Sequence, residues 1–182
     1  AEKPVRCPTS TARRALAAIA LVQRRQATGD DSEDDLLREL SRFLAAQQQA
    51  DGSLLGVWDR ETEQAVPGEY SKFGTGQTLW TFALMDELFP GEGWDEHARR
   101  LARYVATRRD DVEGYFLTFP DHWAAYGLAQ LGPEKLGEPE IAYARRLAGS
   151  GGGMATSGAV SDIGVRVDRY LAEADRQLRQ LA

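Results

Sequence analysis

The sequence is short of the residues that bind metals and form disulfides. Its 182 residues include one cysteine, Cys7, and two histidines, His97 and His122. A single cysteine excludes an intrachain disulfide and a thiolate cluster, and a zinc site would need nearly the whole supply of sulfur and imidazole ligands. We therefore expect no metal site and no cofactor.

Long apolar runs and a basic excess are also missing. The longest apolar run, residues 15–22, is far shorter than the roughly 20 residues that cross a bilayer, so we expect a buried helix there and no membrane span. The net charge is −6, with acidic and basic residues mixed along the chain. Because nucleic-acid binding needs a concentrated basic face, we do not expect a nucleic-acid partner.

The composition indicates one domain. A chain of this length with 42% hydrophobic residues suffices for one well-buried core, and we assign residues 1–182 to a single domain. Arginine supplies 19 of the 22 basic residues, which is typical of a GC-rich bacterial genome. The first residue is Ala1, which fits a trimmed chain and a secreted mature protein equally, so the location stays open.

Apolar residues recur at helical spacing and strand-like alternation is absent, so we predict an all-α fold of about seven helices and no strands. The most regular helix begins at a capping box, residues 32–35, and runs to about residue 50. Its predicted buried stripe is Leu36, Leu37, Leu40, Phe43 and Leu44. Further helices are expected at 11–27, 75–89, 95–108, 121–131, 139–148 and 162–181. A flexible glycine-rich loop is predicted at 149–161, and the long loop 51–71 is a candidate for function.

Residues 43–53 read Phe-Leu-Ala-Ala-Gln-Gln-Gln-Ala-Asp-Gly-Ser, a helix end that runs into a tight turn. This pattern resembles the repeat of the squalene–hopene and oxidosqualene cyclases, which protein prenyltransferases and other α/α-toroid proteins share more loosely. A degenerate copy at residues 104–115 lacks the glutamine and the Asp-Gly. We expect Gln48 to bond the end of the next helix and Asp51-Gly52 to supply the turn geometry. The resemblance implies helical hairpins that form an incomplete α/α toroid, which a protein partner or a second copy would complete.

The chain departs from that family where the chemistry lies. Leu54 stands where the family's repeat usually has Trp, and the Asp-x-Asp-Asp acid of the triterpene cyclases does not occur. Residues 30–34 spell the Asp-Asp-x-x-Asp of isoprenoid synthases, but they straddle a predicted helix start, where acidic residues favour the helix dipole. The resemblance therefore implies a scaffold more than a reaction.

Aromatic residues are concentrated in the middle of the chain. Thirteen of the 16 lie between residues 58 and 126, many beside the starts of the predicted helices 75–89 and 121–131. Aromatic faces there would stack on sugar rings or line an isoprenoid pocket. The predicted substrate-binding residues are Trp58, Tyr70, Phe73, Tyr115, Phe119, Trp123 and Tyr126. The alternative for each ring is a place in the core between helices.

Two carboxylates precede the same two helices. Glu69 and Asp121 occupy matching places, and His122 follows Asp121. Converging carboxylates could serve as acid and base on a glycoside, with His122 moving protons near neutral pH. The alternative for Asp121 is a helix N-cap. Glu69, Asp121 and His122 are the catalytic candidates.

Three functions remain, and the sequence leaves open whether the protein is an enzyme. The first is binding or hydrolysis of a small-molecule or glycan ligand, a carbohydrate-like extended substrate. The second is a non-catalytic scaffold that binds a protein partner. The third, an isoprenoid-binding or cyclising domain, is the weakest because the acid motif is missing.

Overall fold

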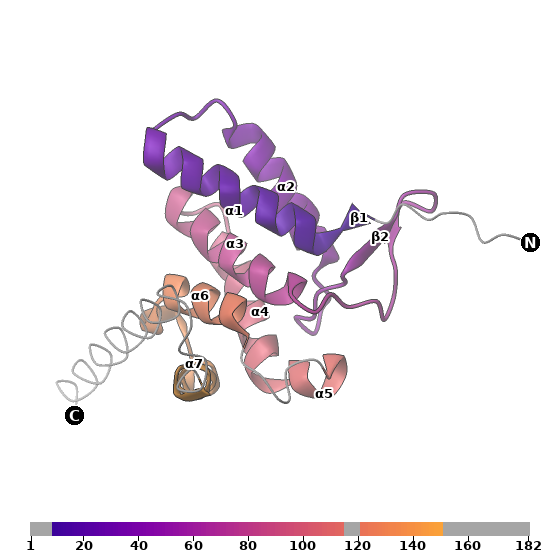
Figure 1. Cartoon of the computed structure of the whole chain (residues 1–182), viewed down its shortest axis with the longest axis vertical. Coiled ribbons are helices and arrows are strands. Elements are labelled where there is room, and N and C mark those ends of the chain that lie inside the picture. The colour runs from indigo at the N-terminus through magenta and orange to yellow at the C-terminus, as the bar shows by residue number, and fades with distance from the viewer. Residues whose placement is uncertain (1–8, 115–120, 151–182) are drawn as a thin grey trace, which may run out of the picture.

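The computed structural model of the chain describes residues 9–114 and 121–150 (Figure 1). These residues form seven α-helices, which confirms the predicted all-α class. The helices are α1 (Thr11–Thr28), α2 (Asp34–Gln47), α3 (Gly74–Leu88), α4 (Trp94–Thr107), α5 (Arg109–Glu113), α6 (His122–Leu131) and α7 (Glu138–Ser150), with a short 3-10 helix, η1 (Pro133–Lys135), between the last two. No helix within these residues is long and apolar enough to cross a membrane.

The helices lie in two rows. In the first row α1 packs against α3 and α3 packs against α6, and Figure 1 shows these three helices one below another. In the second row α2 packs against α1, α4 against α3, and α7 against both α4 and α6. This arrangement of helical pairs agrees with the predicted hairpins, and the closure of such rows into a toroid stays a prediction.

Helix α3 is the centre of the core. Every residue from Gly74 to Met85 except Trp80 is buried, and Leu79, Phe82 and Met85 are fully covered. A helix that is apolar on every side is stable only when neighbours surround it. The sequence of α3 therefore requires the central position that it has between α1, α4 and α6.

Helix α2 is shorter than predicted, and its buried face is rotated about the helix axis from the predicted one. It begins at Asp34 without a side-chain cap and ends at Gln47, where Gln48 takes extended geometry and forms a β-bridge with Leu54. Leu37 and Leu44 are buried, but Leu36 is 43% exposed. The predicted stripe was wrong at Leu36 because the face that meets α1 and α3 is centred on Leu37, Ser41 and Leu44, at spacings of four and three.

The prediction of no strands was also wrong. A three-stranded antiparallel sheet joins β1 (Thr9–Ser10), β2 (Val57–Asp59) and β3 (Gln64–Ala65), with β2 in the middle. Strands of two and three residues are too short to show alternation. The long predicted loop is therefore partly a hairpin that holds the start of α1.

The end of the predicted glycine-rich loop falls beyond the described residues. Helix α7 continues to Ser150, two residues past its predicted end. The predicted helix 162–181 and the remainder of the loop 149–161 lie outside the part of the chain that the structure describes.

Candidate functional site

The turn that carries the family-like repeat is docked on α4. The Gln48 side chain donates to the His97 carbonyl in the first turn of α4 (3.1 Å) and accepts from Arg100 (2.7 Å). Its partner is therefore the start of α4, whereas the expected partner was the end of the next helix along the chain, α3. Gly52 has a φ of 89°, and a Cβ there would lie 2.8 Å from the Arg100 carbonyl oxygen. The turn therefore needs glycine for both its conformation and its close approach to α4. The resemblance to the cyclase repeat itself stays a prediction.

Five aromatic side chains from α3, α6 and the residue before α3 form one contiguous group. We call it the aromatic surface; its members are Phe73, Trp80, His122, Trp123 and Tyr126. Ring centroids lie 4.7 Å apart for the stacked pair Trp80–Tyr126, 5.9 Å for Trp80–Trp123 and 4.9 Å for His122–Trp123. Phe73 extends the group, with its centroid 6.5 Å from that of His122.

The aromatic surface is open to solvent. Phe73 is 39% exposed and His122 is exposed, while Trp80, Trp123 and Tyr126 are half-buried. Three of the predicted substrate-binding residues, Phe73, Trp123 and Tyr126, meet here with the catalytic candidate His122. Trp80 joins them although it was not among the predicted substrate-binding residues. Its place on α3, about two turns from Phe73 and so on the same side of the helix, is the signal that could have included it.

The other predicted ligand contacts do not join this group. Trp58 lies in β2 and packs edge-on against Phe43, with ring centroids 5.5 Å apart. Tyr70 is half-buried beside Tyr104, whose pKa it helps to raise. Tyr115 and Phe119 lie outside the described residues.

Asp121 has the structural role that the sequence offered as its alternative. It is the N-cap of α6 and accepts from the backbone N–H groups of Trp123 (3.0 Å) and Ala124 (3.2 Å). Its other oxygen pairs with Arg109, and both side chains have no exposed area. A substrate cannot reach a carboxylate that is fully covered and bonded in this way, so Asp121 caps α6 and pairs with Arg109 and does not act as an acid or base. Glu69 is exposed, and its backbone carbonyl accepts from Gly56.

Asp121 belongs to a set of buried polar side chains that the sequence did not reveal. We call it the buried polar cluster; its members are Thr75, Tyr104, Arg109, Glu113, Asp121 and Tyr143. Arg109 donates to Asp121 and to the Tyr143 hydroxyl, which ties α5 to α6 and α7. Thr75 and Tyr104 each donate to the same Glu113 oxygen at 3.1 Å, which ties α5 to α3 and α4. The spacing of Arg109 and Glu113, four residues apart in a short helix, is the available sequence signal.

Burial changes the acidity of this cluster. It raises the pKa of Glu113 to about 7, although the nearby Arg109 guanidinium and the two hydroxyl donors oppose the rise. Burial likewise raises the pKa of Tyr143 to about 12. The second Glu113 oxygen, Oε2, is buried without a hydrogen-bond partner among the described residues. Glu113 is therefore a carboxyl group poised to change protonation near neutral pH.

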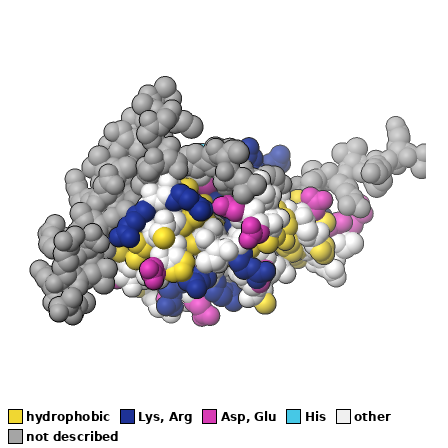
Figure 2. Space-filling view, turned by 90° about the horizontal axis from the view of Figure 1, so that it is seen from below, with side chains coloured by type: hydrophobic (Ala, Val, Ile, Leu, Met, Phe, Trp, Pro, Cys, Tyr) yellow, Lys and Arg dark blue, Asp and Glu magenta, His cyan; other side chains and the backbone are white. Residues whose placement is uncertain are grey.

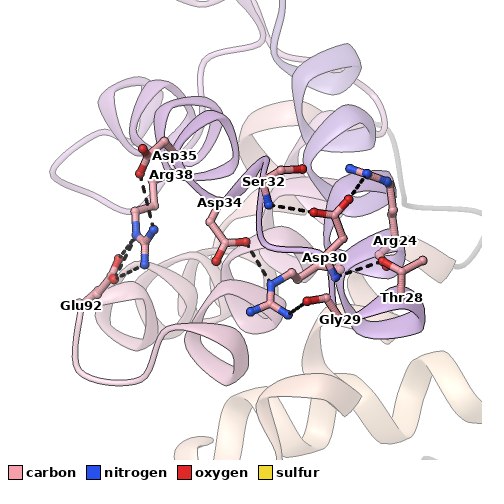
Figure 3. A network of polar contacts seen from close by, with 10 residues as sticks. Arg24, Thr28, Gly29, Asp30, Ser32, Asp34, Asp35, Arg38 and Glu92 are labelled. Atoms are coloured by element: carbon pink, nitrogen blue, oxygen red, sulfur yellow. Dashed lines mark hydrogen bonds and ion pairs between the residues drawn. The ribbon is translucent and has the colours of Figure 1, made fainter.

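The acidic run between α1 and α2 is tied to arginines (Figure 3). Asp30 pairs with Arg24 and accepts from the Ser32 backbone, and Asp34 accepts from Arg25 at 3.1 Å. Arg38 lies between Asp35 and Glu92 and donates to both Glu92 oxygens. These contacts assign Asp30 and Asp34 to the α1–α2 connection. Within residues 9–114 and 121–150 no group of three His, Cys, Asp or Glu side chains is arranged to hold a metal ion.

Comparison with known protein families, with curated proteins and with solved structures gave no match.

Proposed function

We propose that the aromatic surface binds a carbohydrate-like, extended ligand. The observation that carries the proposal is the meeting of five rings from Phe73 and the N-terminal halves of α3 and α6, with Phe73 and His122 exposed. Exposed aromatic faces stack on the C–H faces of sugar rings, and a row of them suits a chain of sugars better than a single compact ligand.

One further observation favours a binding function over hydrolysis, and a second bears on the charge of the ligand. Paired-carboxylate hydrolysis needs two acids that both reach the substrate, and Asp121 is covered and committed to Arg109 and the α6 cap. Acidic and basic side chains are interspersed on the face in Figure 2, and the net charge is −6. An uncharged polymer therefore suits this protein better than an anionic one.

Calorimetric titration with cellohexaose, chitohexaose and xylohexaose tests the proposal. We expect at least one to bind, and Trp123→Ala to weaken its binding about fivefold, since a lost stacking contact is worth about 1 kcal/mol. Trp58→Ala is the matched control, because Trp58 packs against Phe43 and should leave the affinity unchanged. If no oligosaccharide binds at millimolar concentration, the carbohydrate proposal fails.

A non-catalytic scaffold is the second candidate. Leu16 on α1 and Leu36 on α2 are 41% and 43% exposed, and these helices form the hairpin at one end of the two rows. Exposed leucines at the end of a row would suit contact with a further hairpin of a partner or a second copy. If light scattering finds only monomers, self-association is excluded and the scaffold would have to bind a different protein.

A further inference from the structure

The buried polar cluster lies directly beneath the aromatic surface and reaches it by two routes. Thr75, which donates to Glu113, is two residues after Phe73 in the first turn of α3. Asp121, which pairs with Arg109, caps the turn of α6 that carries His122 and Trp123. A Cβ at Gly76 would lie 2.7 Å from both the Ala124 nitrogen and an Asp121 oxygen, so the two helix starts are in close contact.

The charge balance of the cluster depends on one proton. With Glu113 protonated, the Arg109 guanidinium balances Asp121, because Asp110, whose Oδ1 lies 4.0 Å from Arg109 Nε, also pairs with Arg146. With Glu113 ionised, two carboxylates share that single cation and a net negative charge is buried. Two hydroxyls also contact Glu113, those of Thr75 from α3 and Tyr104 from α4. Tyr70 lies near Tyr104, and the Tyr143 hydroxyl from α7 accepts from Arg109. Arg146 and Asp110 pair with each other at 3.1 Å at the edge of the cluster.

We propose that the Glu113 carboxyl couples pH to the shape and ligand affinity of the aromatic surface. Loss of its proton draws Arg109 from Asp121 toward Glu113, and the first turn of α6 loses part of its anchor. Trp123 and His122 then lose their fixed positions against Trp80. The predicted pH dependence of ligand affinity rests on the proposed function. The coupling between Glu113 and Trp123 does not require a ligand.

The coupling is measured on the indole N–H resonances of ¹⁵N-labelled protein between pH 5.5 and 8.5, without ligand. We expect the Trp123 resonance to shift with a midpoint near 7, and the shift to disappear in Glu113→Gln. It should survive in His122→Gln, the control for the imidazole 4.9 Å from Trp123. A shift that survives Glu113→Gln and disappears in His122→Gln, or no shift in the wild type, overturns the proposal.

A second variant covers the case in which Glu113→Gln does not fold. Tyr104→Phe removes one donor to the ionised carboxyl and should move the midpoint upward, because that hydrogen bond favours the charged form. An unchanged midpoint in this variant contradicts the proposal.

The pH dependence of ligand affinity is measured with cellohexaose, chitohexaose and xylohexaose as probes. We expect the wild type to bind about threefold more weakly at pH 8.5 than at pH 5.5, and Glu113→Gln to bind equally at both. If the indole titrates as expected and none of the three probes binds, the coupling stands and the proposed function fails. If one of them binds equally at both pH values in the wild type, the proposed function stands and the coupling to affinity is wrong.

Discussion

Glu113 is a carboxyl group that folding moves from water into a covered site with two hydroxyl donors. Its pKa rises from the ordinary value of 4.5 to about 7. The folded state therefore binds this proton more tightly than the unfolded chain, and the resulting stabilisation is complete below pH 4.5 and lost as the pH rises through 7.

Glu113→Gln should remove that dependence. Between pH 5.5 and 8 the wild type should lose about 2 kcal/mol of unfolding free energy relative to Glu113→Gln, because the variant has no proton to lose. Urea denaturation gives the unfolding free energy of both proteins at the two pH values. Subtracting the value of the variant from that of the wild type removes the contribution of the other titrating groups. A constant difference across this range would mean that Glu113 is ionised throughout.

Asp121 and Asp51 form a matched pair that differs in burial. Each accepts from backbone N–H two residues ahead and pairs with an arginine, but Asp51 is 38% exposed and 3.5 Å from Arg108. Asp121→Ala should cost about 3–5 kcal/mol, since it leaves Arg109 as an uncompensated buried charge. Asp51→Ala should cost about 1 kcal/mol, the value of a lost turn contact. Equal losses in urea denaturation would contradict the assignment of the Arg109–Asp121 pair.

At the scale of the helices, glycine sets how closely α3 and α6 approach. Gly76 faces the Ala124 nitrogen, and Gly127 faces the Trp80 nitrogen, where a Cβ would lie 2.8 Å away. Because each glycine faces the backbone of the other helix and has no side chain, α3 and α6 can pack closely together. This contact brings Phe73 and Trp80 beside His122 and Trp123.

Gly76→Ala should destabilise the protein by about 1–3 kcal/mol, because the added methyl group overlaps backbone and the Asp121 cap. It should also move the Trp123 indole resonance. Gly29→Ala is the control: it has open space but a φ of 73°, so it should cost about 1 kcal/mol and leave that resonance in place. Thermal denaturation measures the loss of stability, and the indole spectrum reports the position of the Trp123 resonance. A Trp123 resonance that stays in place in Gly76→Ala would contradict this packing of α3 against α6.

Helix positions could be predicted from the sequence because caps and glycines mark their ends. Gly29 closes α1 in left-handed geometry and Asp121 opens α6, both where local pattern placed them. The turn of α2 about its axis could not be predicted, since Leu36 and Leu37 are equally apolar and only the neighbours decide which is covered. The small sheet depends on backbone pairing between Thr9 and Trp58, 49 residues apart, which leaves no local signal.

At the scale of the whole molecule, two rows of helices bring the starts of α3 and α6 to the same place (Figure 1). Equivalent helix starts made the meeting of Phe73, His122 and Trp123 predictable. The buried polar cluster was not predictable, because it joins side chains from α3, α4, α5, α6 and α7 whose contacts depend on packing angles. The burial of Asp121 was not predictable for the same reason, because its matching position with Glu69 gave no information about burial, although its N-cap role was foreseen as the alternative.

The proposed ligand site is the aromatic surface, and the four tryptophans of the chain comprise two members of that surface and two controls outside it. Trp80 and Trp123 belong to that surface, Trp58 lies in β2, and Trp94 is 5% exposed and donates to Glu92. The direct measurement is a titration of ¹⁵N-labelled protein at pH 6 with whichever oligosaccharide binds. We expect the Trp80 and Trp123 indole resonances to move together with one dissociation constant while those of Trp58 and Trp94 stay in place. Movement of the Trp58 resonance alone, or of all four equally, would rule out the aromatic surface as the ligand site.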